Sequence, residues 1–261
     1  MSTTYAVYAS DGPLATLTFN RPEARNAMTW EMYQALVDAC DRADDDPAVR
    51  VLILKGAGGK AFVAGTDIAQ FQSFRGPQDG IAYEKRIDQV LDRLERVTKA
   101  TIAQIQGVAA GGGCAIAFGC DLRVATPESS FGIPVARTLG NCLSGATCSR
   151  LVDLLGPGLV KDMLLTGRFV PAAEALGLGI VSRVEPAEKI DTFVQEYALR
   201  IAANAPLTVR ATKEMLRRIM AARRLPPGED QDLITMCYTS KDFREGISAF
   251  LAKRPPKWTG T

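Results

Sequence analysis

Three consecutive glycines at residues 111–113 lie between an apolar run at 101–105 and a stretch of small and apolar residues from 114 to 118. That order predicts a buried strand, a tight turn and the start of a helix. Successive glycines cost chain entropy, but they let another group approach the backbone closely. The first amides of a helix have no intrahelical acceptor, so such a turn can hold an anion or an oxygen that gains negative charge. Tight packing of the strand against the helix explains the glycines equally well.

The sequence contains no histidine, and this narrows the chemistry. Ser-His and Cys-His nucleophile pairs, histidine general bases and histidine metal ligands are all excluded. The six cysteines include no C-x-x-C pair and are interpreted as free thiols. We therefore expect no metal site, and acid-base chemistry must use Asp, Glu, Tyr, Lys or Cys.

The charge balance excludes other classes of function. The formal net charge is +2 with 23% charged residues, which is not typical of a nucleic-acid-binding protein. No apolar run reaches the length of a membrane span, and residues 1–5 lack the features of a signal peptide. We expect a cytoplasmic protein without nucleic-acid or membrane partners.

The pattern of the chain predicts an α/β core followed by helices. Length and 47% hydrophobic content allow one large core, or a core with an appendage. Strands are expected at 5–9, 14–19, 51–54, 101–105, 122–125 and 180–184, and helices at about 29–43, 80–97, 146–155, 157–166 and 171–177. Beyond these the chain is helical with breaks, so strands and helices alternate first and helices alone follow.

With these elements in place, the chain resembles the crotonase superfamily, the enoyl-CoA hydratase/isomerase family, over nearly its whole length. Five segments in order carry the resemblance: F-N-R-P at 19–22 with N-A-M at 26–28, A-F-V-A-G-T-D-I at 61–68, G-V-A-A-G-G-G-C at 107–114 with C-D-L-R at 120–123, F-G-I-P at 131–134, and F-L-A-K-R at 250–254. The resemblance implies a spiral of β-β-α units over residues 1–195. It also implies a C-terminal helical region, 196–261, that builds homotrimers or dimers of trimers.

The resemblance further implies an enzyme that acts on an acyl-CoA thioester, with coenzyme A as part of the substrate and no separate cofactor. The backbone amides of Thr66 and Gly112 would bind the thioester carbonyl oxygen. Fixed amide dipoles suit this role because negative charge builds on that oxygen as an enolate forms. The implied coenzyme A contacts are Arg25, Ala27, Ala64, Asp67, Ile68 and, in a neighbouring subunit, Lys253. A solvated Arg25, a helix-capping Asp67 and a plain basic terminus at Lys253 and Arg254 are the structural alternatives.

The chain departs from the hydratases of the family at two positions. A hydratase uses one glutamate just beyond the motif cysteine and another after the proline of the Phe-Gly-x-Pro motif. Here these positions hold Ala115 and Val135, and a shift of one residue brings only Ala136 to the second. Since positioned acid-base groups contribute about 10²–10⁴ each to a rate, efficient hydration by the family mechanism is not expected.

Other polar residues are candidates to replace the missing pair. Arg137, Asn141 and Ser144 are candidates for polar groups of the acyl pocket, and Tyr83 and Glu84 lie on a helix from which some members of the family supply a catalytic group. Three hypotheses remain open. In the first, the chain is an acyl-CoA enzyme with non-standard chemistry, such as decarboxylation, thioester hydrolysis or hydration with other groups. In the second, it is a non-catalytic acyl-CoA-binding or assembly protein. In the third, it is an ordinary enoyl-CoA hydratase.

Overall fold

The computed structural model describes residues 5–261. The prediction that no signal peptide begins the chain rests largely on residues 1–4, which lie outside the described residues. The strands form a six-stranded and a four-stranded sheet. The larger sheet has the order β1 (Ala6–Asp11), β2 (Leu14–Phe19), β3 (Val51–Gly56), β5 (Ala100–Ile105), β7 (Leu122–Ala125) and β10 (Arg183–Val184), and the smaller has the order β4 (Ala61–Val63), β6 (Val108–Ala110), β8 (Ser130–Gly132) and β9 (Val170–Pro171).

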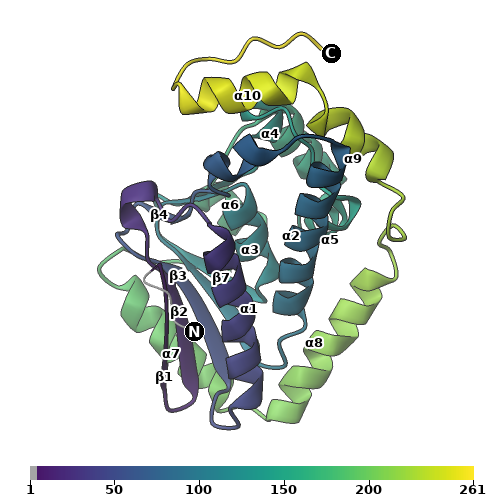
Figure 1. Cartoon of the computed structure of the whole chain (residues 1–261). Coiled ribbons are helices and arrows are strands. Elements are labelled where there is room, and N and C mark those ends of the chain that lie inside the picture. Colours follow the sequence, from purple (N-terminus) through teal and green to yellow (C-terminus); the bar gives the residue numbers. More distant parts are fainter. Residues whose placement is uncertain (1–4) are drawn as a thin grey trace.

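The core repeats one path three times (Figure 1). A strand in the larger sheet is followed by a short strand in the smaller sheet and then by a helix. The three units are β3, β4 and α2 (Pro77–Glu95), then β5, β6 and α3 (Gly112–Gly119), then β7, β8 and α4 (Val135–Thr138). Equivalent strands of successive units pair in parallel in both sheets. This is the predicted spiral of β-β-α units, so the expected fold class is confirmed.

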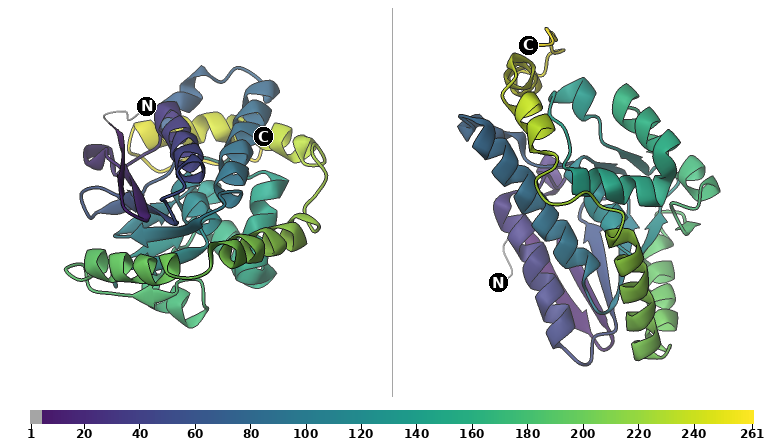
Figure 2. Two further views of the ribbon diagram at one scale, coloured as in Figure 1. Left: turned by 90° about the horizontal axis from the view of Figure 1, so that it is seen from below. Right: turned by 90° about the vertical axis from the view of Figure 1, so that its right-hand side faces the viewer.

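Helices cover both faces of the larger sheet, and strand β3 shows why. Side chains of a strand alternate between its faces. Leu52 and Leu54 pack in the core that includes the buried face of α1 (Trp30–Asp45). Val51 and Ile53 pack in a second cluster with the apolar side of α7 (Ile190–Ala202). The sheet therefore lies between α1 and α7, as Figure 2 (left) shows.

The C-terminal part is helical, as expected. After α5 (Gly145–Thr166) and α6 (Ala172–Gly177), the chain adds α7 and then α8 (Pro206–Ala221), α9 (Gln231–Tyr238) and α10 (Lys241–Leu251). Helix α9 packs on α2, and α10 packs on a 3₁₀ helix, η2 (Ile68–Ser73); a further 3₁₀ turn, η1, spans Pro22–Ala24. Helix α8 lies at the edge of the molecule and buries none of its residues (Figure 2, right). In the described part of the chain, no helix has the length and apolar character to cross a membrane.

Two local expectations need correction. The strand expected at 180–184 pairs only at Arg183–Val184, because the Ile180 amide bonds to the Ala175 carbonyl and continues the end of α6. By contrast, the break expected between helices at 146–155 and 157–166 is confirmed, because α5 is interrupted at Gly156, where φ is 74° and ψ is 156°. A strand, β6, separates the apolar run at 101–105 from the glycines, where a turn alone was expected.

Candidate active site

The three glycines have different structural roles. Gly111 adopts a φ of 51° and precedes the first residue of α3, Gly112. A Cβ at Gly113 would lie 2.2 Å from the Val63 carbonyl oxygen, so that glycine lets α3 pack against β4. A Cβ at Gly112 would lie 2.6 Å from the Tyr33 hydroxyl oxygen. Tight packing therefore explains Gly113, whereas Gly112 lies beside a polar group.

Two backbone amides near these glycines are left free. A parallel bridge joins Met28 to Thr66: the Met28 amide donates to the Gly65 carbonyl, and the Asp67 amide donates to the Met28 carbonyl. The Thr66 amide between them and the Gly112 amide donate no hydrogen bond within residues 5–261. Thr66 and Gly112 both line one cavity of about 760 Å³. The cavity therefore has two donors of the kind that an oxyanion requires, and the oxyanion role itself stays a prediction.

A chain of three hydroxyl groups fixes the Thr66 side chain. Its Oγ1 atom lies 2.7 Å from the Tyr33 hydroxyl and 2.7 Å from the Tyr83 hydroxyl. Burial raises the pKa of both tyrosines, so they are neutral near pH 7. Because Thr66 Oγ1 is held by these bonds, the backbone at Thr66 is held in one orientation.

The segments expected to contact coenzyme A meet at the same cavity. Its lining includes Arg25, Ala27, Ala64, Asp67 and Ile68. The Arg21 guanidinium donates to Asp67 Oδ2 at 2.7 Å, and Asp67 Oδ1 accepts from the Ala69 amide at 3.1 Å. Asp67 therefore caps η2, as its structural alternative predicted, while it also lines the cavity. The coenzyme A contacts stay predictions.

The two positions at which the family resemblance implies the glutamates of a hydratase also lie at the cavity. Ala115 and Val135 both line it. Ala115 is 7% exposed, and its side chain is one methyl group at the first turn of α3. The structure therefore places apolar groups where the family resemblance implies the acid-base pair of a hydratase.

The polar residues predicted for the acyl pocket, Arg137 on α4 and Asn141 and Ser144 in the loop before α5, divide into two groups. Arg137 and Asn141 line the cavity. Ser144 does not: its Oγ donates to Asp88 Oδ1 at 2.8 Å and accepts from the Thr147 amide at 3.0 Å, which caps α5. Asn141 Nδ2 donates to the Tyr238 hydroxyl at 3.2 Å, and its Oδ1 atom is buried with no partner among the described residues.

Glu84 lies at the cavity as a buried carboxyl group. It is 3% exposed, and it accepts from the Tyr238 hydroxyl at 2.5 Å and from the Ser144 amide at 3.0 Å. Burial raises the pKa of Glu84 to about 8, although these two hydrogen bonds partly offset the rise. Glu84 and Tyr83 were candidates from the sequence, but the face of their helix was not predictable. Tyr238, 154 residues further along the chain, gave no sequence signal at all.

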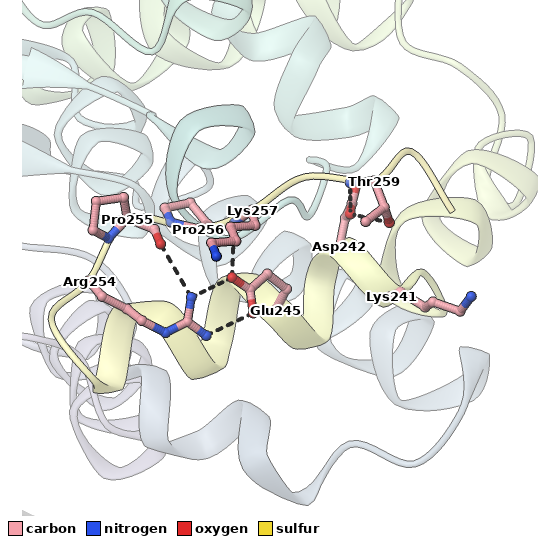
Figure 3. A pocket seen from close by; sticks show the side chains of 8 residues that line it. All are labelled: Lys241, Asp242, Glu245, Arg254, Pro255, Pro256, Lys257 and Thr259. Carbon is pink, nitrogen blue, oxygen red and sulfur yellow. Dashed lines mark hydrogen bonds and ion pairs between the residues drawn. The ribbon is translucent and has the colours of Figure 1, made fainter.

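The C-terminal tail folds back over α10 and forms a separate hollow (Figure 3). Arg254 pairs with Glu245, and the Thr259 amide donates to Asp242 at 2.7 Å. Lys253, with a φ of 52°, lines neither this hollow nor the larger cavity. Its predicted contact with coenzyme A involves a neighbouring subunit and stays a prediction. Among residues 5–261, no cluster of three or more acidic or cysteine side chains is placed to hold a metal ion.

Comparison with known proteins identifies the family. Residues 10–261 match the model of the family described as "Enoyl-CoA hydratase/isomerase". The chain is 35% identical over 244 residues to a crotonyl-CoA hydratase of Syntrophomonas wolfei subsp. wolfei, with 92% of each chain covered. It is 34% identical to a short-chain-enoyl-CoA hydratase of Clostridium acetobutylicum, with 95% of each covered.

A solved structure shares the fold closely. A methylmalonyl-CoA decarboxylase complexed with 2S-carboxypropyl CoA superposes with a TM-score of 0.90 at 29% identity, and all of both chains is covered. The sequence resemblance, the three repeats of the β-β-α unit and these matches point to the same family, and the family model covers residues 10–261. The chain belongs to the enoyl-CoA hydratase/isomerase family of enzymes.

Proposed function

We propose that the protein acts on an acyl-CoA thioester, forms an enolate at the amides of Thr66 and Gly112, and completes its reaction without the glutamate pair of a hydratase. One observation carries the proposal. Two amides without an acceptor among residues 5–261 line a cavity together with Ala115 and Val135, the residues that the family resemblance aligns with that pair. The names of the relatives and the ligand of the decarboxylase structure support an acyl-CoA substrate.

The two amides supply the electrostatic part of the reaction. The thioester carbonyl oxygen accepts from both N–H groups, and the bonds strengthen as the oxygen becomes negative. Each such donor typically contributes about 10²–10³ to the rate. The coenzyme A moiety lies over the segments around Arg25 and Asp67, and Arg137 and Asn141 contact a polar acyl group. No separate cofactor takes part.

Decarboxylation is the reaction class that this set of cavity residues, two amide donors beside the apolar Ala115 and Val135, favours. When the bond between Cα and a carboxylate breaks, its electron pair forms the enolate and CO₂ leaves. No base is needed for this step, so the absence of a glutamate at Ala115 and Val135 does not prevent it. One proton must then reach Cα. Similarity to a methylmalonyl-CoA decarboxylase over the whole chain supports this class.

Hydration of an enoyl-CoA is the second candidate. Two similar proteins, which cover more than nine tenths of the chain, are named as hydratases of crotonyl-CoA and of short-chain enoyl-CoA. Hydration here would need groups other than the usual glutamates to activate water.

A panel of thioesters tests both candidates. Crotonyl-CoA, malonyl-CoA, methylmalonyl-CoA and butyryl-CoA are incubated with the protein, and the products are read by mass. Loss of 44 mass units as CO₂, abolished in Gly112→Pro, supports the proposal, because proline removes the amide donor. Hydration of crotonyl-CoA at rates usual for the family contradicts it. Tight binding without turnover of any thioester indicates the non-catalytic alternative.

We also propose that the protein forms a homotrimer or a dimer of trimers. Helix α8 buries none of its residues in the single chain, although it carries apolar side chains. Leu207 is 77% exposed and Met215 is 60% exposed. An apolar face of this extent is typical of a surface that another subunit covers. The cytoplasmic location and the division of the chain at residue 195 stay predictions.

A further inference from the structure

Glu84 is set apart by its lack of a cationic partner. Of the cavity-lining residues in the described chain, only Asp67 and Glu84 carry carboxyl groups. Asp67 is paired with the Arg21 guanidinium at 2.7 Å. Within residues 5–261, Glu84 accepts hydrogen bonds only from neutral donors: the Tyr238 hydroxyl and the Ser144 amide. A carboxyl group buried in this way is costly for the fold, because its charged form is poorly solvated.

The groups around Glu84 hold it in one position at the cavity wall. Tyr238 comes from α9 and links Glu84 to Asn141, whose Nδ2 donates to the same hydroxyl at 3.2 Å. Asn141 Oδ1 is buried without a partner among the described residues, and Asn141 lines the cavity. The Glu84 carboxyl group is therefore surrounded by three elements: α2, α9 and the loop before α5. The Asn141 Oδ1 atom, on the same hydrogen-bonded chain, accepts no hydrogen bond from the described residues.

We propose that Glu84 is the catalytic residue that exchanges a proton with the α-carbon of the thioester, and that Tyr238 is a positioning residue that acts through Glu84. The inference rests on the proposed function. In decarboxylation, the neutral Glu84 carboxyl gives its proton to Cα, the enolate electron pair forms the new C–H bond, and a carboxylate is left that regains a proton from water. In the reverse sense, the Glu84 carboxylate takes a proton from Cα, and the C–H electron pair forms the enolate.

The surroundings of Glu84 favour the neutral form near pH 7. Burial is the largest cause of its raised pKa, and the carboxylates of Asp88 and Asp230 add to the rise. Arg150 binds Asp88 at 3.2 Å, which reduces that contribution. The remaining titratable groups that face Glu84 are the hydroxyls of Tyr33, Tyr83 and Tyr238 and the thiols of Cys142 and Cys148. Burial raises the pKa of the three tyrosines and of Cys148, and the hydrogen bond with Cys237, followed by burial, raises the pKa of Cys142. None of the five therefore carries a charge that would draw the proton from Glu84.

Exchange of the α-protons of propionyl-CoA in D₂O tests the inference in the full-length protein. The wild-type exchange rate should rise with pH and level off above about pH 8, because the carboxylate form removes the proton. Glu84→Gln should lower the rate about 10²–10⁴-fold, since glutamine cannot take a proton. Glu196→Gln, on the exposed side of α7, is the matched control and should exchange as the wild type does.

Tyr238→Phe separates positioning from folding. The Tyr238 hydroxyl lowers the pKa of Glu84, so its loss should move the midpoint of the exchange profile to higher pH. A merely structural role would change the rate without moving the midpoint. This variant keeps the inference testable if Glu84→Gln folds poorly.

The outcomes distinguish the inference from the proposed function. Exchange in folded Glu84→Gln equal to that of the wild type overturns the inference alone, and so does a midpoint that Tyr238→Phe leaves unchanged. No exchange in the wild-type protein overturns the inference together with the enolate chemistry. Exchange lost in Gly112→Pro and in Glu84→Gln, with propionyl-CoA still bound by Glu84→Gln in calorimetry, supports both.

Discussion

The Tyr33 hydroxyl lies 2.7 Å from Oγ1 of Thr66, in the core and beside Gly112. This hydrogen bond joins α1 to the segment that carries one of the two free amides. Tyr33 is 1% exposed, so water cannot replace the bond. Because Thr66 Oγ1 bonds to the hydroxyls of Tyr33 and Tyr83, the Thr66 side chain does not compete with the Thr66 backbone amide for a bound ligand.

Tyr33→Phe should therefore affect stability and the site together. Loss of the hydroxyl leaves Thr66 Oγ1 with Tyr83 alone, and we expect the free energy of unfolding to fall by about 0.5–1.5 kcal/mol. We also expect slower α-proton exchange, because the Thr66 amide is held less firmly. Urea unfolding and the exchange assay measure the two effects. Tyr197→Phe on α7 is the control, and an equal change in that variant would contradict this reasoning.

Gly113→Ala should destabilise the fold while it leaves the two proposed oxyanion donors, the amides of Thr66 and Gly112, in place. Its Cβ would lie 2.2 Å from the Val63 carbonyl oxygen and 2.6 Å from Val63 Cβ, so β4 and α3 must move apart. Overpacking of this kind typically costs about 1–3 kcal/mol. Gly158→Ala on α5 is the matched control, because nothing lies within 4 Å of its added Cβ. Unfolding midpoints in urea check the pair, and unchanged stability of Gly113→Ala would exclude the close contact.

The sequence allowed much of the core to be predicted, because long apolar runs and amphipathic helices repeat at regular intervals. The strands at 14–19 and 122–125 have the expected bounds. The smaller sheet was missed, since its strands span only two or three residues each and three residues show no alternation. The strand expected at 180–184 failed because two of its buried residues belong to the turn after α6.

The candidate site was predictable where a motif fixes the backbone. Thr66 and Gly112 were predicted from short segments, and both line one cavity, while their role as oxyanion donors stays a prediction. The sequence did not distinguish Glu84 from its neighbour Tyr83, because the role of Glu84 depends on which face of α2 meets Tyr238 and Asn141. Those contacts join residues far apart in the chain, and no local pattern encodes them.

Arg123 should be essential for the position of α3. It is 5% exposed, and its guanidinium donates to the carbonyls of Ile180 and Cys120, each at 2.6 Å. Arg123→Met leaves these acceptors buried and unpaired, at a cost of about 1–3 kcal/mol each. Thermal unfolding should show the loss, and Arg183→Met, at an exposed position, should not. Equal stability of the two variants would show that the buried carbonyls find other donors.

A charge on the exposed face of α8 should disrupt the proposed assembly. Met215→Glu and Ile219→Glu each place a carboxylate on a side chain that is about half exposed in the single chain, at 60% and 48%. If another subunit covers this face, the charge must be desolvated and the assembly should dissociate towards the 28.1 kDa chain. Light scattering after size-exclusion chromatography measures the mass. Leu178→Glu is the control, and a wild-type monomer would contradict the proposed trimer.

The raised pKa of Glu84 should make the stability of the protein depend on pH in a defined direction. The pKa is about 8 in the folded protein and has a reference value of 4.5. Between these values the folded state binds a proton that the unfolded state has released. The contribution of Glu84 to the free energy of unfolding must therefore fall as pH rises from about 4.5 to 8, with a slope of up to about 1.4 kcal/mol per pH unit.

Glu84→Gln isolates this contribution, because glutamine has a similar shape and does not titrate. The difference in the free energy of unfolding between wild type and variant should change steadily from pH 5 to pH 8, with the wild type losing stability relative to the variant. Above about pH 8 the difference should level off, because Glu84 is then ionised in both states. Urea unfolding at each pH measures it, with Glu196→Gln as the reference. A difference that stays constant from pH 5 to pH 8 would mean that Glu84 ionises in the folded protein as an ordinary surface carboxyl group does.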